Sequence, residues 1–75
     1  MTVTFKNQYE NVVVKTDITN KKEVFKAIDD YLSLKNIESP YMRIVGTSPN
    51  QTMIDYGSHT NFFFVDTDVE NLIKN

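Results

Sequence analysis

Two short segments near the start of the chain alternate hydrophobic and polar residues with a period of two. They span residues 2–6 and 11–16, are rich in Val and Thr, and are separated by the polar stretch 7–10. Such alternation is typical of half-buried strands, and the short polar stretch between them favours a hairpin. The face of this hairpin that is expected to be buried carries Val3, Phe5, Val12 and Val14.

A helix is predicted after this hairpin. Asn20 suits the N-cap position, and Glu23, three residues later, completes a capping-box pattern. The helix should end near Lys35, because Asn36 tolerates a left-handed backbone and Ile37 is then placed to fold back on the last turn. The apolar residues in between follow the 3.6-residue period of an amphipathic helix. They are Val24, Phe25, Ile28, Tyr31 and Leu32.

Three further strands are predicted in the second half of the chain, over residues 41–46, 52–57 and 61–65. The polar turns 47–51 and 58–60 connect them into a meander. A second capping-box pattern beginning at residue 67 predicts a short helix at the end of the chain. The fold class expected is therefore α+β, a single domain over residues 1–75 with the element order ββαβββα and an antiparallel sheet. The main helix is expected on one face of that sheet.

The meander admits a register that pairs Ile44 with Ile54 and Tyr56 with Phe62. Residues directly opposite one another in a sheet lie on the same face, so this register assigns every side chain to a face. It predicts a core face formed by Met42, Ile44, Ile54, Tyr56, Phe62 and Phe64. The opposite face would then carry Tyr41, Arg43, Val45, Met53, Asp55, Phe63 and Val65.

Composition and charge exclude several classes of site. The 75 residues contain no cysteine and one histidine, so disulfides, cysteine-based metal sites and histidine clusters are excluded. The net charge is −2 and the lysines are scattered, which disfavours nucleic acid as a partner. No segment resembles a signal peptide or an apolar membrane span, so a cytoplasmic protein without a membrane partner is expected. No metal and no cofactor are expected.

Asp55, Ser58 and His59 are the residue types of a hydrolytic triad. Their spacing argues against one, because adjacent Ser58 and His59 diverge in a tight turn and Asp55 lies on a strand. Gly57 and the hydroxyl groups around it instead suit a turn. We therefore expect no catalytic residues and a protein that is not an enzyme.

The run Phe62–Phe64 is the strongest indication of a binding surface. Side chains alternate sides along a strand, so three successive phenylalanines cannot share one face. In the register above, Phe63 leaves the main core and joins Tyr41, Arg43 and Asp55, where Arg43 lies opposite Asp55 in a favourable cross-strand pair. These four residues are the predicted partner-binding site.

Three alternatives for what covers this face remain open. The terminal helix would cover it with Val69, Leu72 and Ile73, which makes Phe63 a second core residue. Another protein, or a second copy of the chain in a homodimer, would use it as an interface. Single-stranded nucleic acid is the alternative, since bases stack on exposed aromatic rings.

The segment Asp55-Tyr56-Gly57-Ser58-His59-Thr60, followed by Phe62-Phe63, resembles a segment of small uncharacterised phage and prophage proteins of low-GC Gram-positive bacteria. The resemblance covers residues 41–65. It implies an origin and no catalytic residues. Phage accessory proteins of this size often bind one host or phage protein, so the resemblance favours a non-enzymatic protein-binding function.

Overall fold

The computed structural model describes residues 1–38, 41–58 and 60–70 of the chain. They form a small α+β domain with five antiparallel strands and one helix, which confirms the predicted fold class, the five strands and the main helix. The predicted terminal helix lies mostly on residues 71–75, outside the described part of the chain. The elements are β1 (Val3–Lys6), β2 (Asn11–Lys15), α1 (Lys21–Leu34), β3 (Arg43–Ser48), β4 (Gln51–Asp55) and β5 (Phe62–Val65).

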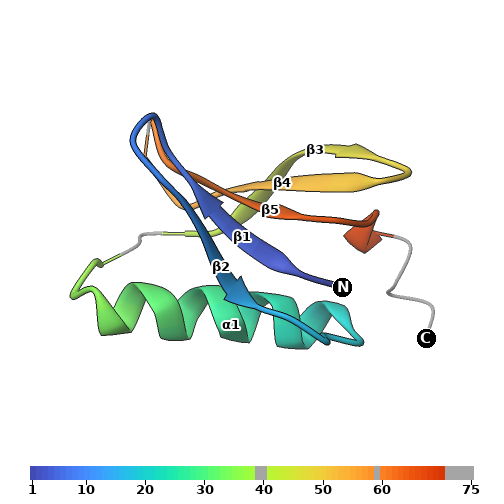
Figure 1. Ribbon diagram of the computed structural model, residues 1–75, viewed down its shortest axis with the longest axis horizontal. Coiled ribbons are helices and arrows are strands. Elements are labelled where there is room, and N and C mark those ends of the chain that lie inside the picture. The colour runs from blue at the N-terminus through green and yellow to red at the C-terminus, as the bar shows by residue number, and fades with distance from the viewer. Residues whose placement is uncertain (39–40, 59, 71–75) are drawn as a thin grey trace.

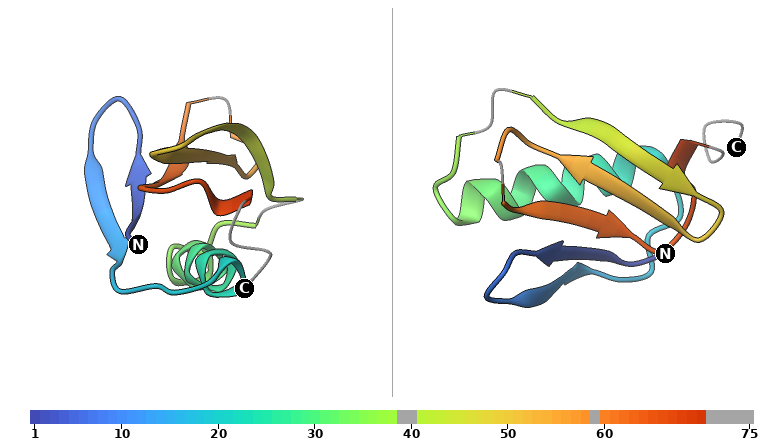
Figure 2. Two further views of the ribbon diagram at one scale, coloured as in Figure 1. Left: turned by 90° about the vertical axis from the view of Figure 1, so that its right-hand side faces the viewer. Right: turned by 90° about the horizontal axis from the view of Figure 1, so that it is seen from above.

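The strands form one antiparallel sheet in the order β2-β1-β5-β4-β3 (Figure 1). The predicted hairpin is present as β1–β2, and the predicted three-strand meander is present as β3–β4–β5. What joins them is the pairing of β1 with β5, which places the first and the last strand next to each other inside the sheet. Figure 2 shows that the sheet curves over α1, with the β1–β2 hairpin at an angle to the other three strands.

Both ends of α1 have the caps that the sequence predicted. At the start, the Asn20 side chain accepts a 2.9 Å hydrogen bond from the N–H of Glu23. At the end, Asn36 has a left-handed backbone with φ of 58°, and the Ile37 N–H donates to the Leu32 carbonyl at 2.9 Å. These bonds satisfy backbone groups that a bare helix end leaves without partners. The buried stripe of the helix is Val24, Ala27, Ile28 and Leu32.

The prediction of which β5 side chains point into the core is wrong. Phe63 is 0% exposed and belongs to the core, whereas Phe62 and Phe64 lie on the other side of the strand. The observed register pairs Ile54 with Phe63, one residue away from the predicted pairing of Tyr56 with Phe62. A shift of one residue exchanges the two faces of a strand, so Phe62, Phe64 and Val65 all change sides together with Phe63.

Aromatic side chains surround Phe63 in the core. Its ring centroid lies 5.2 Å from that of Phe5, 5.5 Å from Tyr56 and 5.9 Å from Tyr31. These partners come from β1, from the residue after β4 and from α1, so Phe63 ties the helix to three parts of the sheet. The core comprises Val3, Phe5, Ile18, Val24, Ala27, Ile28, Leu32, Ile54, Tyr56, Phe63, Val65 and Val69.

Candidate interaction surface on the open sheet face

The helix covers one face of the sheet, and in the described part of the chain no element lies over the other (Figure 2, right). A mostly apolar row crosses this open face. Thr4 of β1 lies between Val13 on one neighbouring strand and Phe64 on the other, and Phe64 in turn pairs with Met53. The row ends at Gly46, where a β-carbon would meet nothing within 4 Å. The row thus crosses all five strands of the sheet.

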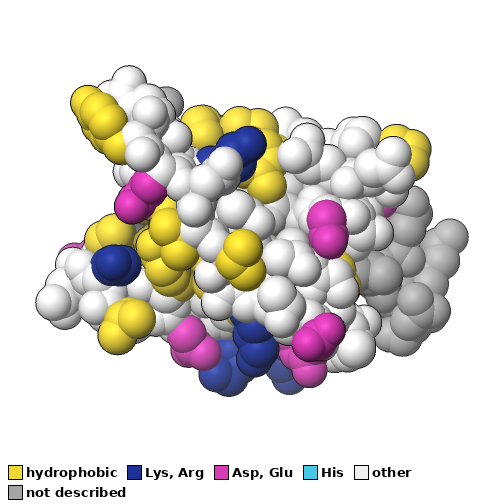
Figure 3. All heavy atoms as spheres, in the orientation of Figure 1, with side chains coloured by type: hydrophobic (Ala, Val, Ile, Leu, Met, Phe, Trp, Pro, Cys, Tyr) yellow, Lys and Arg dark blue, Asp and Glu magenta, His cyan; other side chains and the backbone are white. Residues whose placement is uncertain are grey.

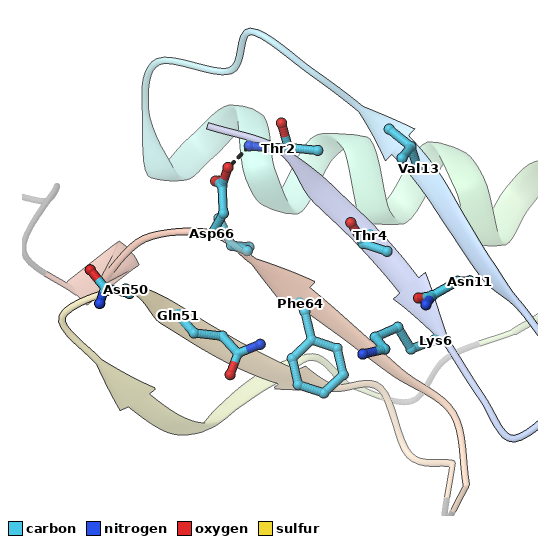
Figure 4. Close-up of a pocket in the computed structure, with 10 residues that line it drawn as sticks. Thr2, Thr4, Lys6, Asn11, Val13, Asn50, Gln51, Phe64 and Asp66 are labelled. Carbon is cyan, nitrogen blue, oxygen red and sulfur yellow. Dashed lines mark hydrogen bonds between the residues drawn. The ribbon is translucent and has the colours of Figure 1, made fainter.

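Phe64 lies in the middle of the open face, between two hollows. The larger has a volume of about 530 Å³ and the smaller about 220 Å³, and both are bordered by Phe64 and Gln51. Figure 4 shows the Phe64 ring in the larger hollow with the Lys6 side chain reaching toward it. The Lys6 ammonium lies 5.3 Å from the ring centroid, within the range of a cation–π contact. The larger hollow is lined mainly by Thr2, Thr4, Lys6, Asn11, Val13, Gln51, Phe64 and Asp66.

Asp66 closes one end of the larger hollow. Its carboxylate accepts a 2.7 Å hydrogen bond from the Thr2 N–H, and its own N–H donates to the Thr2 carbonyl at 3.3 Å. Lys6 lies four pairs further along the same two strands, opposite Phe62. The open face therefore has a cation at one end of the hollow and an anion at the other.

A polar cluster formed by Tyr41, Arg43 and Asp55 lies at the β3–β4 end of the open face. The Asp55 side chain is only 8% exposed. Its carboxylate accepts from the Gly57 N–H at 3.0 Å and from the Tyr41 hydroxyl at 3.2 Å, and it lies 3.4 Å from Nε of Arg43. The Arg43 guanidinium is also 5.3 Å from the Tyr41 ring centroid. Asp55 thus orients two more exposed side chains that are common in interfaces.

The same contacts set the acidity of Asp55. The hydrogen bond from the Gly57 backbone is the main cause that holds the pKa of this carboxyl below its ordinary value, and Tyr41 and Arg43 lower the pKa further. Burial acts in the opposite direction but does not prevail. The bond also stabilises the turn in which Gly57 adopts φ of 99°, a conformation that favours glycine.

We expect the stability of the fold to fall as the pH drops through the pKa of folded Asp55. Because this pKa is lower in the folded chain than in the unfolded one, Asp55 stabilises the fold above an unfolded pKa of about 3.9 and loses that contribution in more acidic solution. Thermal melts between about pH 6 and about pH 2 measure this dependence. Asp55→Asn should weaken it, whereas Asp29→Asn, on the exposed side of α1, controls for the loss of one carboxylate. An unchanged pH slope in Asp55→Asn would contradict the assignment.

Three of the four predicted site residues come together, and the fourth does not. Tyr41, Arg43 and Asp55 form the cluster described above, and the predicted pairing of Arg43 with Asp55 is confirmed. Phe63 is enclosed by the core and does not reach the open face. The aromatic residue that occupies the position expected for it is Phe64. Phe64 was missed because its face depends on the register of β5, which the sequence alone did not determine.

Ser58 and Asp55, two of the three triad residue types, accept hydrogen bonds from backbone N–H groups of the turn. The Ser58 hydroxyl accepts from the backbone N–H groups of Thr60 and Asn61 at 3.3 and 3.1 Å. The carboxylate of Asp55 is already bonded to its own neighbours, and His59 lies outside the described residues. Among residues 1–38, 41–58 and 60–70, no three side chains are grouped as metal ligands.

Comparison with protein-family models, with curated proteins and with solved structures finds no match to the chain. Because no match assigns a family, the class of this protein is described by its fold and its exposed surface. It is a small α+β domain in which one helix covers one face of a five-stranded sheet, and no other described segment covers the opposite face. Within the described segments, no helix has the length and apolar character needed to cross a membrane.

Proposed function

We propose that this chain is a non-enzymatic binding module whose open sheet face engages a protein partner. The observation that carries the proposal is the position of Phe64, which lies between two hollows at the centre of the sheet face that no described element covers. Large aromatic side chains in concave surroundings supply much of the binding energy of protein interfaces. Met53 and Val13 extend the apolar area on either side of Phe64.

The charges of the open face favour a protein over a nucleic acid. Lys6 and Arg43 are accompanied by Asp66 and Asp55, so both signs occur along the same surface. A surface that follows a phosphate backbone needs several uncompensated cations. Figure 3 shows the same mixture on another side of the molecule, where basic and acidic side chains adjoin along α1. Single-stranded nucleic acid stays the second candidate, supported by the combination of Phe64 with Lys6 on a sheet face.

Tyr41 and Arg43 provide the polar edge of this interface. Their contacts to Asp55 hold them in place before a partner arrives, which lowers the entropy lost on binding. Arginine and tyrosine are the residue types most often responsible for interface energy, together with tryptophan. The partner surface thus consists of an aromatic centre at Phe64 and an oriented cation at Arg43.

The resemblance of segment 55–63 to phage and prophage proteins supports a more specific form of the proposal. In it, the chain is a phage or prophage accessory protein, its partner is a host or phage protein, and both meet in the cytoplasm of the host cell. Affinity capture from bacterial lysate before and after phage infection, followed by mass spectrometry, identifies the candidate partner.

Phe64→Ala is expected to weaken binding of the captured partner by about 30-fold, as for the loss of a hot-spot side chain. The free energy of unfolding should fall by only about 1 kcal/mol, because the ring is partly exposed. Titration calorimetry with the purified partner measures the first quantity and thermal melting the second. Tyr9→Ala, in the exposed β1–β2 loop, is the matched control for removing an aromatic ring and should bind as the wild type does.

Fluorescence anisotropy with single-stranded oligonucleotides tests the second candidate. The protein-binding proposal expects no salt-dependent binding that requires Phe64. Submicromolar oligonucleotide binding that Phe64→Ala abolishes would replace the protein partner with a nucleic acid. A captured protein that binds Phe64→Ala as tightly as the wild type would show that the open face is not its site.

A further inference from the structure

The two end strands of the sheet, β2 and β3, each contain a bulge. β2 has one extra residue, Val14, where its pairing with β1 shifts register, and β3 has one, Val45, where its pairing with β4 shifts. A bulge twists the edge of a sheet and interrupts the regular row of backbone groups that another strand needs. Addition of a partner strand is therefore disfavoured at both edges, which leaves the open face as the surface that a partner would contact.

A second row of side chains crosses the open face beside the apolar row that contains Phe64. Lys6 lies opposite Phe62, and Arg43 lies opposite Asp55. The register of β4 with β5 continues the row by placing Asp55 opposite Phe62. Adjacent strands are about 4.8 Å apart, so the backbones of Lys6 and Arg43, three strand spacings apart, are separated by about 14 Å. In order across the sheet, the row consists of Lys6, Phe62, Asp55 and Arg43.

Both ends of this row are positively charged at the surface. Lys6 is exposed and makes no ion pair within residues 1–38, 41–58 and 60–70. The Arg43 side chain is 65% exposed, whereas the Asp55 side chain that it contacts is almost completely buried. The Asp55 carboxylate also accepts two hydrogen bonds from other groups of the chain. A partner that lies over this row therefore meets the two cations, while the carboxylate is already enclosed.

The exposed negative charge of the open face lies at its other end. Asp66 is four pairs away from Lys6 along β5 and β1, which corresponds to about 13 Å. Its carboxylate accepts from the Thr2 N–H, and its neighbours on the two adjacent segments, Thr2 and Gln51, are neutral. The open face is thus polarised along its strands. Two cations flank an aromatic residue at one end, the apolar row lies in the middle, and one carboxylate lies at the far end.

We propose that the partner contacts this row with an acidic segment, in which two carboxylates about 14 Å apart flank an apolar side chain. Four residues of extended chain span about 13 Å, and side chains at alternate positions point the same way. Acidic residues four positions apart would therefore reach Lys6 and Arg43, and an apolar residue midway between them would contact Phe62. The inference rests on the proposed function of the open face and adds the chemistry of its partner.

A nucleic acid is also anionic, but its charges are spaced differently. Every nucleotide carries a phosphate, so a strand that runs from Lys6 to Arg43 would place further phosphates between them. The residues at that place are Phe62 and Asp55, and neither is a cation. An acidic protein segment instead carries charge at the two ends only. Its neutral or basic residues can lie toward Asp66.

NMR titration of the isotope-labelled chain with a capped peptide, Gly-Glu-Ser-Leu-Ser-Glu-Gly, tests the proposal at low salt. We expect saturable shifts of the amides around Lys6, Phe62 and Arg43, with a Kd of about 1 mM. The same peptide with glutamine in place of both glutamates should bind about tenfold more weakly. Lys6→Gln and Arg43→Gln should each weaken binding about threefold, because each removes one ion pair. Lys22→Gln, which removes an exposed cation of α1, is the matched control and should have no effect.

The captured protein partner separates this proposal from the proposed function. A partner that requires Phe64 but binds Lys6→Gln and Arg43→Gln as tightly as the wild type would retain the function and overturn the acidic chemistry. Absence of shifts with the glutamate peptide overturns it as well, and so does equal binding of the glutamine peptide. A single-stranded oligonucleotide that shifts the same amides more strongly than the peptide, and loses binding in Lys6→Gln, would replace the acidic protein with a nucleic acid.

Discussion

Replacing Phe63 with alanine is expected to lower the free energy of unfolding by about 3–5 kcal/mol. The side chain is fully buried and its ring contacts Phe5, Tyr31 and Tyr56. Removing it leaves a cavity where the helix meets three parts of the sheet, and these rings come from rigid elements that can close the cavity only in part. Small domains have a total stability of about 5–15 kcal/mol, so the variant should be largely unfolded near 37 °C.

The neighbouring Phe64 is the matched control for this substitution. It is the same residue type on the same strand, and Phe64→Ala should cost about 1 kcal/mol because its side chain lies on the open face. Equilibrium denaturation in urea measures both changes. The expected order, with Phe63 far more costly than Phe64, is the reverse of the order predicted from the sequence. Equal losses for the two variants would contradict the observed register of β5.

The second large effect is expected at Thr52. Its side chain is fully buried and its hydroxyl makes two hydrogen bonds to the segment that follows β5. It donates to the Thr67 carbonyl at 2.7 Å and accepts from the Val69 N–H at 2.9 Å. Thr52→Val keeps the shape of the side chain and leaves both backbone groups without this partner. We expect a loss of about 1–3 kcal/mol, because a buried donor without an acceptor keeps its full desolvation cost.

Thr52→Ser distinguishes the hydrogen bonds from the packing. Serine keeps the hydroxyl and loses one methyl group, which costs about 0.8 kcal/mol for the buried area. Serine should therefore be better tolerated than valine, although valine is the more hydrophobic residue. Amide hydrogen exchange at Val69 should accelerate in Thr52→Val and remain slow in Thr52→Ser. If valine proved the more stable substitution, the hydroxyl bridge would not be what holds Val69 in the core.

Local features of this fold could be predicted because their causes lie within a few residues of one another. The cap formed by Asn20 and the left-handed Asn36 involve contacts that span at most five positions. The β1–β2 hairpin follows in the same way from two alternating segments joined by a short polar stretch. The pairing of Arg43 with Asp55 was predicted as well, although the turn between β3 and β4 alone would set a register one residue away. A bulge between Ile44 and Gly46 brings Arg43 opposite Asp55.

The face of β5 was not predictable in this way. Residues 56–61 separate β4 from β5, and a connection of this length admits registers that differ by one residue. Each of the four residues of β5 is apolar, so the strand has no polar side that would mark solvent. Its register is decided by the pairing with β1. In that pairing Phe5 lies opposite Phe63, although the two residues are far apart in the sequence.

The sequence by itself thus determined the helix with its two caps, the first hairpin, the three-strand meander, the α+β class, and the Tyr41–Arg43–Asp55 part of the candidate surface. Each of these depends on periodicity or on contacts between near neighbours in the chain. Only the tertiary structure decided the strand order, the burial of Phe63, the exposure of Phe64 and the hollows around it. These depend on the pairing of β1 with β5, the first and last strands, whose register is selected by packing of the whole core.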